Sequence, residues 1–189
     1  NHNDSISKII YNYTWMNKSI KIGGASGFWG DSFIATSQLL NADNKLDFIV
    51  YDYLAEITMS ILARARSNDQ SLGYATDFVS AMVQPNLQAI ASSGVKLISN
   101  AGGVNPEACA QAIRDCVAQA GLDLKVAVIT GDDLLPRVEE LSAGGAREMF
   151  SSEPMPAVKK IASVNAYIGA FPIAEALTHG GMRNRVKVI

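Results

Sequence analysis

The sequence has few residues of the kinds that mark several large protein classes. Its two cysteines, Cys109 and Cys116, are too few for a disulfide framework, and their helical spacing indicates free core thiols in a reducing cytoplasm. The net charge of −2 gives no basic footprint for nucleic acid. No stretch approaches the roughly 18 consecutive apolar residues of a membrane span. With His2 and His179 as the only histidines, we predict no metal site.

What is present is the composition of an ordinary globular domain, with 48% hydrophobic and 18% charged residues in a chain of 189. That length suits one domain with a sizeable core. Residues 1–15 are rich in Asn, Ile, Tyr and Ser, and the composition changes near Met16. We therefore interpret 1–15 as a leader and 16–189 as a single α/β domain. Residues 183–189 have the pattern of a strand that stops abruptly, which suggests an incomplete N-terminal part of a longer domain. Its open strand edge would suit a partner chain or a second copy.

In the stretch of residues 20–31 a short apolar strand runs into a glycine-dense turn, which is expected to lead directly into a helix over residues 31–40. Glycine has no Cβ, so the backbone can turn sharply there and approach a ligand closely. Asp31 or Ser32 is expected to cap the helix, whose positive end suits an anionic or polar ligand group. The alternative is a tight turn in which the glycines serve packing only and the aromatic rings pack under the helix. We predict ligand contacts at Gly24, Ser26, Gly27, Trp29, Gly30 and Asp31.

Strand and helix patterns alternate along the rest of the chain. Pro85 should kink one helix, and Asn105 followed by Pro106 should start another. The apolar runs between the helices lie at residues 46–51, 95–99, 125–130 and 161–168. This alternation predicts an α/β fold, a doubly wound, Rossmann-like parallel sheet with helices on both faces. In such sheets ligands bind outside the carboxyl ends of the strands. The polar and glycine residues that follow the strands should meet there, and we predict ligand contacts at Asn100, Gly102, Gly103, Asn105, Asp132 and Asn165.

The predicted edge is rich in carboxylates and amides and has no obvious cation. Asp52 and Glu56 follow the second strand and are our candidate catalytic residues. A carboxylate there can activate or position a substrate, bind magnesium or accept hydrogen bonds from ribose. The alternative is that Asp52, Asp132 and Asn105 cap the helices that follow them.

Four segments in order carry a resemblance to the acyclic terpene utilisation family, AtuA: residues 21–31, 51–56, 99–106 and 165–170. The match runs from about residue 19 to residue 180. The resemblance implies a large N-terminal domain and a role in the breakdown of citronellol- and geraniol-type compounds through coenzyme A thioesters. It therefore favours a small anionic or acyl-CoA-type ligand, and it implies a pathway more than a reaction or a cofactor. After Gly180 the chain departs from the family pattern, whose next segment ends in an Arg that would be the natural cation of this edge.

Two other interpretations stay open. Residues 24–30 are similar to the Gly-x-x-Gly-x-x-Gly turn of extended short-chain dehydrogenases, and Asn100-Ala-Gly is similar to a motif of the same enzymes. This resemblance implies an NAD(P)-dependent oxidoreductase, although the Tyr-x-x-x-Lys pair of those enzymes is absent from the sequence. The third interpretation is a non-catalytic subunit or scaffold that a partner chain completes. The sequence does not decide between an enzyme and such a subunit.

Overall fold

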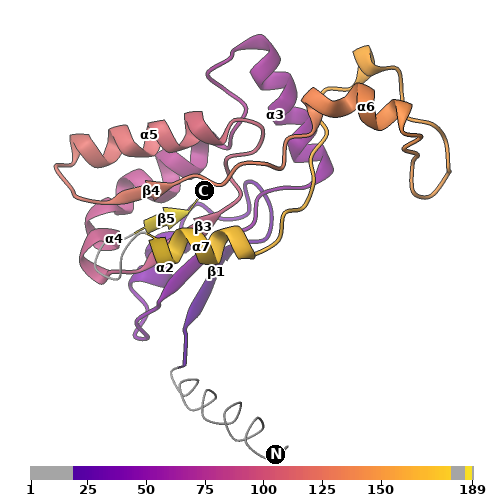
Figure 1. Ribbon diagram of the computed structural model, residues 1–189. Coiled ribbons are helices and arrows are strands. Elements are labelled where there is room, and N and C mark those ends of the chain that lie inside the picture. Colours follow the sequence, from indigo (N-terminus) through magenta and orange to yellow (C-terminus); the bar gives the residue numbers. More distant parts are fainter. Residues whose placement is uncertain (1–18, 180–185, 189) are drawn as a thin grey trace, which may run out of the picture.

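The computed structural model describes residues 19–179 and 186–188. At its centre is a five-stranded parallel sheet in the order β1-β2-β3-β5-β4 (Figure 1). The strands are β1 (Ile22–Ser26), β2 (Phe48–Tyr51), β3 (Lys96–Ser99), β4 (Lys125–Ala127) and β5 (Val186–Val188). Phe48 pairs with Ile22 on one side and with Lys96 on the other, so the first three strands begin at the same level. The predicted leader, residues 1–15, lies outside the described residues.

Helices cover both faces of the sheet, which confirms the predicted α/β fold. One layer consists of packed neighbours: α2 (Ala35–Leu40), a π-helix (Phe78–Val83), α4 (Leu87–Ser93) and α5 (Pro106–Gln119). α7 (Phe171–His179) contacts β5 and lies in front of the sheet in Figure 1. The chain crosses from β3 to β4 through α5 and returns to β5 through α7. Because such crossovers are right-handed, a reversal of direction changes the face that the helix covers.

Two further helices lie away from these layers. α3 (Glu56–Asn68) and α6 (Val138–Ala143) lie outside the sheet, toward the top and the right of Figure 1. Short 3₁₀ helices occupy Gln84–Asn86, Leu135–Arg137 and Val158–Lys160. In the part of the chain that the structure describes, none of the helices has the length and apolar character needed to cross a membrane.

The main core lies between the sheet and the layer that contains α2, α4 and α5. Ile49 and Leu97, on neighbouring strands, are buried there together with Phe78 of the π-helix. The Tyr51 ring meets the Phe78 ring edge-on, with 5.0 Å between centroids. The other face of the sheet is more open, and Ile22 on β1 is 62% exposed there. The sequence pattern predicts a fully buried β2, but its burial alternates, because α7 covers only part of the second face.

Three predicted elements differ from the structure. The helix expected from residue 31 begins only at Ala35, and the strand expected over 125–130 ends at Ala127. The run 161–168 forms no strand, because β5 already occupies the place beside β4. It crosses the surface instead and pairs with the loop after β4 through the single bridge between Asp133 and Asn165.

The strand predicted near the end of the chain is present as β5, but it is not an edge strand. It pairs with β3 on one side and with β4 on the other. The edges of the described sheet are β1 and β4. The expectation of an open edge at residues 183–189 is therefore wrong for the described part, Val186–Val188.

Local signals identified other elements correctly. The helix around Pro85 changes from a π-helix to a 3₁₀ turn and then to α4, as expected where a residue without an N–H interrupts the ladder. α5 begins at Pro106, and Gly121 follows it with a φ of +64°. Both cysteines are free thiols. Cys109 is buried in the core, and burial raises its pKa to about 12.

Candidate functional site

The glycine-dense turn closes on itself through Asp31. The backbone N–H of Gly27 donates to Asp31 Oδ2 at 2.9 Å. Gly30 has a φ of +89°, a conformation that residues with a Cβ rarely adopt. The carboxylate of Asp31 is thus used within the turn, and α2 begins at Ala35 with no side-chain cap. The prediction that Asp31 or Ser32 caps a helix starting at once is wrong, so no helix end strengthens this turn as an anion site.

The other residues of the turn differ in their exposure. Gly24 and Phe28 are exposed, and Phe28 is 60% accessible. Trp29 is half-buried, and its indole N–H donates to Asp77 Oδ1 at 2.6 Å. Ser26, at the end of β1, is half-buried. Trp29 therefore joins the turn to the start of the π-helix.

Asp52 and Asn100 come together at the carboxyl ends of β2 and β3. The Asn100 side-chain amide donates to Asp52 Oδ1 at 2.7 Å, and its oxygen accepts the Tyr53 backbone N–H at 2.7 Å. The backbone N–H of Asp52 in turn donates to the Ser26 carbonyl at 3.3 Å. These bonds link the ends of the first three strands. Glu56, the exposed first residue of α3, makes no hydrogen bond to Asp52 or Asn100 in the described chain.

Four of the remaining predicted residues line a pocket of about 290 Å³ between the loops that follow β3 and β4: Gly103, Asn105, Asp132 and Asn165. Asn165 reaches it from the distant run 161–168 and donates to Asp132 Oδ2 at 2.9 Å. The Ala166 N–H also donates to the Asp132 carbonyl at 2.8 Å, so Asp132 holds the returning chain against the loop after β4. The residues that line the pocket are Arg66, Gly103, Val104, Asn105, Pro106, Glu107, Thr130, Gly131, Asp132, Asp133 and Asn165.

The start of α5 opens onto this pocket without a side-chain cap. Asn105 is at the predicted cap position, but its amide donates to the carbonyls of Gln70 at 3.0 Å and Leu72 at 2.8 Å. The predicted cap is therefore not formed, because the amide ties the turn to the loop after α3. The first N–H groups of α5 are left for solvent or a ligand, and the acidic Glu107 lies in the same first turn.

Arg66 supplies a cation at this edge, where the sequence pattern predicts none. It is half-buried on α3, lines the pocket and donates through Nη1 to the Val104 carbonyl. Gly103, whose φ is +53°, allows this approach, since a Cβ there would collide with Leu62 and lie 2.7 Å from the Gly73 carbonyl oxygen. Gly102 beside it is buried. No local motif around Arg66 reveals this role, because it depends on how α3 packs on a loop almost 40 residues away.

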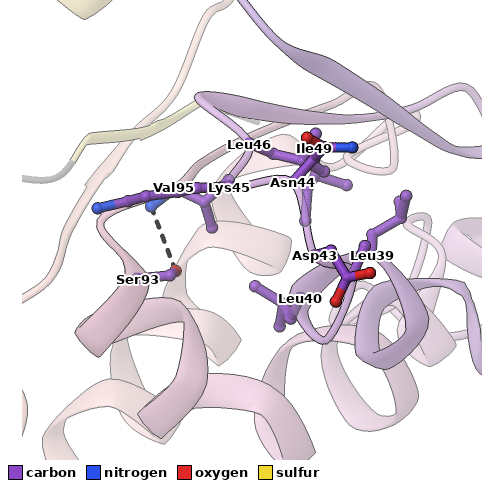
Figure 2. Close-up of a pocket in the computed structure, with 10 residues that line it drawn as sticks. Leu39, Leu40, Asp43, Asn44, Lys45, Leu46, Ile49, Ser93 and Val95 are labelled. Carbon is purple, nitrogen blue, oxygen red and sulfur yellow. Dashed lines mark hydrogen bonds between the residues drawn. The ribbon is translucent and has the colours of Figure 1, made fainter.

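A second pocket, also of about 290 Å³, lies at the amino ends of the strands, opposite the carboxyl ends (Figure 2). Leu39, Leu40 and Leu46 line it together with residues near the start of β3. There the Val95 N–H donates to Ser93 Oγ at 3.3 Å. None of the predicted site residues lies in this pocket. Since parallel sheets bind ligands at the carboxyl ends of their strands, we place the candidate site at the pocket beside Arg66.

The fold and this pocket define an α/β protein with a cavity of the kind that such sheets use for small ligands, where neighbouring crossovers leave on opposite faces. The family model described as acyclic terpene utilisation family protein AtuA matches residues 20–182, so the chain belongs to this family. It is therefore a protein related to acyclic terpene utilisation. No curated protein and no solved structure matches the chain.

Proposed function

We propose that this protein binds a small anionic ligand of the acyl-CoA type at the pocket beside Arg66, within acyclic terpenoid breakdown. One observation carries the proposal: a guanidinium and the uncapped start of a 14-residue helix line the same pocket. The family supports the pathway, and the chemistry of the lining supports the anionic ligand.

The physical basis is the combination of charge and free N–H groups. Arg66 uses one N–H for Val104, and a guanidinium has five, so the others are available for a phosphate or carboxylate. The amide groups at the start of α5 add the positive end of the helix dipole. Asp132, Asp133 and Glu107 oppose an anion in the same lining, so we expect the anionic group to lie on the Arg66 side.

Asp52 and Glu56 are proposed to act on the reacting part of the ligand. Asn100 occupies one oxygen of Asp52 and fixes the carboxylate at the strand end. Such a carboxylate is positioned to accept a proton or a hydroxyl hydrogen bond. The exposed backbone of the glycine turn, from Gly24 to Gly30, is proposed to contact the same ligand.

Thermal unfolding with a panel of acyl-CoAs, nucleotides and dinucleotides tests the proposal. We expect an acyl-CoA to raise the midpoint, since a ligand that binds only the folded state stabilises it. Arg66→Gln keeps a donor for Val104 but removes the charge, and should weaken binding about tenfold, or roughly 1.4 kcal/mol. Arg64→Gln, at an exposed position of the same helix, is the matched control and should bind as the unaltered protein does. A folded protein that none of these ligands stabilises, or equal binding by both variants, would contradict the proposal.

A second candidate is a dinucleotide-dependent oxidoreductase, and the position of Asp52 at the end of β2 favours it, since dinucleotide folds hold the ribose with such a carboxylate. The strand order argues the other way. In those folds the glycine turn follows a central strand, whereas β1 is an edge strand of the described sheet. Stabilisation by NAD(P)H that Asp52→Ala abolishes would favour this candidate over an acyl-CoA.

A further inference from the structure

The loop after α6 presents an apolar tip to solvent, formed by Met149 and Phe150. Residues 142–154 are all exposed, and the loop extends from the right-hand side of the molecule (Figure 1). Within it, Met149 is 80% exposed and Phe150 is 87% exposed. A single exposed apolar residue needs no explanation, but two large ones side by side on a projecting loop are typical of an interaction site. Phenylalanine and methionine are also residues that interfaces favour.

Hydrogen bonds hold this tip in one conformation. Glu148 Oε2 accepts the Phe150 N–H at 2.8 Å and the Ser151 N–H as well. The Ser152 N–H donates to the Glu148 carbonyl at 3.0 Å, and Arg147 Nη1 donates to the Ser152 carbonyl at 2.8 Å. Among the described residues other than glycine, only Ser152 has a positive φ, +59°, and such positions gather at functional sites. An ordered loop loses less entropy on binding, so the tip is prepared for a contact.

The pocket at the amino ends of the strands has the size and lining to receive an aromatic ring. Its volume of about 290 Å³ exceeds the roughly 150 Å³ of a protein cavity that binds benzene. Three leucines line it together with Ile49, which has no exposed surface (Figure 2). The Ser93 hydroxyl donates to the Ile90 carbonyl at 3.3 Å and accepts the Val95 N–H, so it is already paired. An apolar group therefore suits this pocket better than a polar ligand.

We propose that Phe150 of one copy inserts into this pocket of a second copy of the chain, with Met149 against the rim. The tip does not reach the pocket of its own copy. The loop after α6 and the pocket, which lies beside α2 and the start of β3, are on different sides of the molecule (Figure 1). One chain thus carries both an aromatic anchor and a cavity for it, and the two can meet only between copies.

Charged residues around the two surfaces allow ion pairs across this contact. Asp43 and Lys45 are exposed at the pocket, and Arg147 and Glu153 flank the tip. None of these four residues forms an ion pair within the part of the chain that the structure describes. Each surface carries one charge of each sign, so Asp43 can face Arg147 while Lys45 faces Glu153.

The two surfaces differ, so the contact joins copies head to tail. Such a contact leaves one tip and one pocket unused at the ends, and it continues until a ring closes or a filament grows. A tip of two residues buries less than the roughly 1,200 Å² of a stable interface, so we expect weak association, half complete at about 100 µM protein. This inference does not rest on the pocket beside Arg66.

Sedimentation velocity of the 189-residue chain over about 10 to 500 µM tests the contact, and the mean mass should rise with concentration. Phe150→Ser removes the anchor and should weaken association at least about tenfold. Phe171→Ser is the matched control, because Phe171 is 89% exposed at the start of α7 and lies outside both surfaces. It should associate as the parent does. Circular dichroism checks that every variant is folded.

A second variant blocks the pocket instead of the tip. Ala42 is exposed at the pocket, so Ala42→Trp can fill the cavity without disturbing the core, and it should weaken association at least about tenfold. Phe150→Ser still has a pocket and Ala42→Trp still has a tip. Each alone should remain a monomer, whereas an equimolar mixture should form a one-to-one dimer and nothing larger. Lys45→Glu should weaken association several-fold, and adding Glu153→Lys to it should restore the parent affinity.

Three results would overturn the proposal. The first is a parent protein that stays monomeric at about 500 µM, or that associates equally well as Phe150→Ser. The second is association that Phe150→Ser abolishes but Ala42→Trp leaves unchanged, since the tip would then bind a different surface. The third is a mixture of these two variants in which no dimer forms.

Discussion

The two ends of the carboxyl edge of this sheet are built differently. At the β3–β4 end, an open pocket has a charged lining with Arg66, carboxylates and an uncapped helix start. At the β1–β2 end, a glycine turn lies over aromatic rings and unpaired buried oxygens. The glycine turn is the more conspicuous feature of the sequence, yet the pocket formed at the other end. Glycines indicate where a backbone can turn sharply. A pocket forms only where loops that are distant in the sequence leave space between them.

The largest expected effect on the free energy of unfolding is that of Gly103, which lines the pocket at the β3–β4 end. Gly103→Ala combines a positive φ with a collision against Leu62 and the Gly73 carbonyl, and should cost roughly 3–5 kcal/mol of unfolding free energy. Gly121→Ala is the control, because its φ is also positive but open space surrounds it, and it should cost about 1 kcal/mol. Urea unfolding measures both. Equal losses would mean that Gly103 serves only backbone conformation.

The stability contributed by the β1–β2 end should be the more sensitive to alkaline pH. Burial raises the pKa of Tyr51 from 10.0 to about 12, although its bond to Thr36 opposes the shift. A raised pKa in the folded state contributes stability that is complete below pH 10 and is lost as the pH rises toward 12. Between pH 8 and pH 12 the free energy of unfolding of Tyr51→Phe should therefore fall by about 2–3 kcal/mol less than that of the parent protein. Parallel losses in urea unfolding at both pH values would contradict a buried Tyr51 hydroxyl.

The bond between Trp29 and Asp77 should account for much of the attachment of the glycine turn. Trp29→Phe keeps an aromatic ring but removes the donor to a carboxylate, at an expected cost of about 1.5–3 kcal/mol in unfolding free energy. Phe28→Leu, at the exposed neighbouring position, should change it by less than about 0.5 kcal/mol. If both substitutions cost the same, the turn is held by general packing and the two ends are less different than we infer.

The smallest effect on the free energy of unfolding is expected at Asn100, which lies between the two ends. Asn100→Ala removes the bonds to Asp52 and to the Tyr53 N–H, and because Asn100 is exposed we expect a loss of about 1 kcal/mol. Asn44→Ala, exposed at the opposite edge, should lie within about 0.5 kcal/mol of the parent. A neutral Asn100→Ala would show that water replaces the side chain and that it does not order the strand ends.

Much of the fold follows from short-range signals. The start of α5 at Pro106, the change of helix type at Pro85 and the alternation of strands and helices are each determined by a few neighbouring residues. The failures have a common cause. The run 161–168 is apolar enough for a strand, but its place beside β4 is taken by β5, and only the topology reveals that competition. Asp31 and Asn105 are good caps in isolation, yet each side chain has a better partner within the fold.

By itself the sequence determined the class of fold, the family motifs and the meeting of Asp52 and Asn100 at the ends of β2 and β3, because parallel strands must share their carboxyl edge. Only the tertiary structure decided that Asp132 and Asn165 line a pocket, whereas the exposed Asp52 and Asn100 bond to each other outside its lining. Arg66 and Asp77 show the reason most clearly. Arg66 lies within α3 and Asp77 directly precedes the π-helix, and the role of each arises from a loop or ring that chain folding brings beside it.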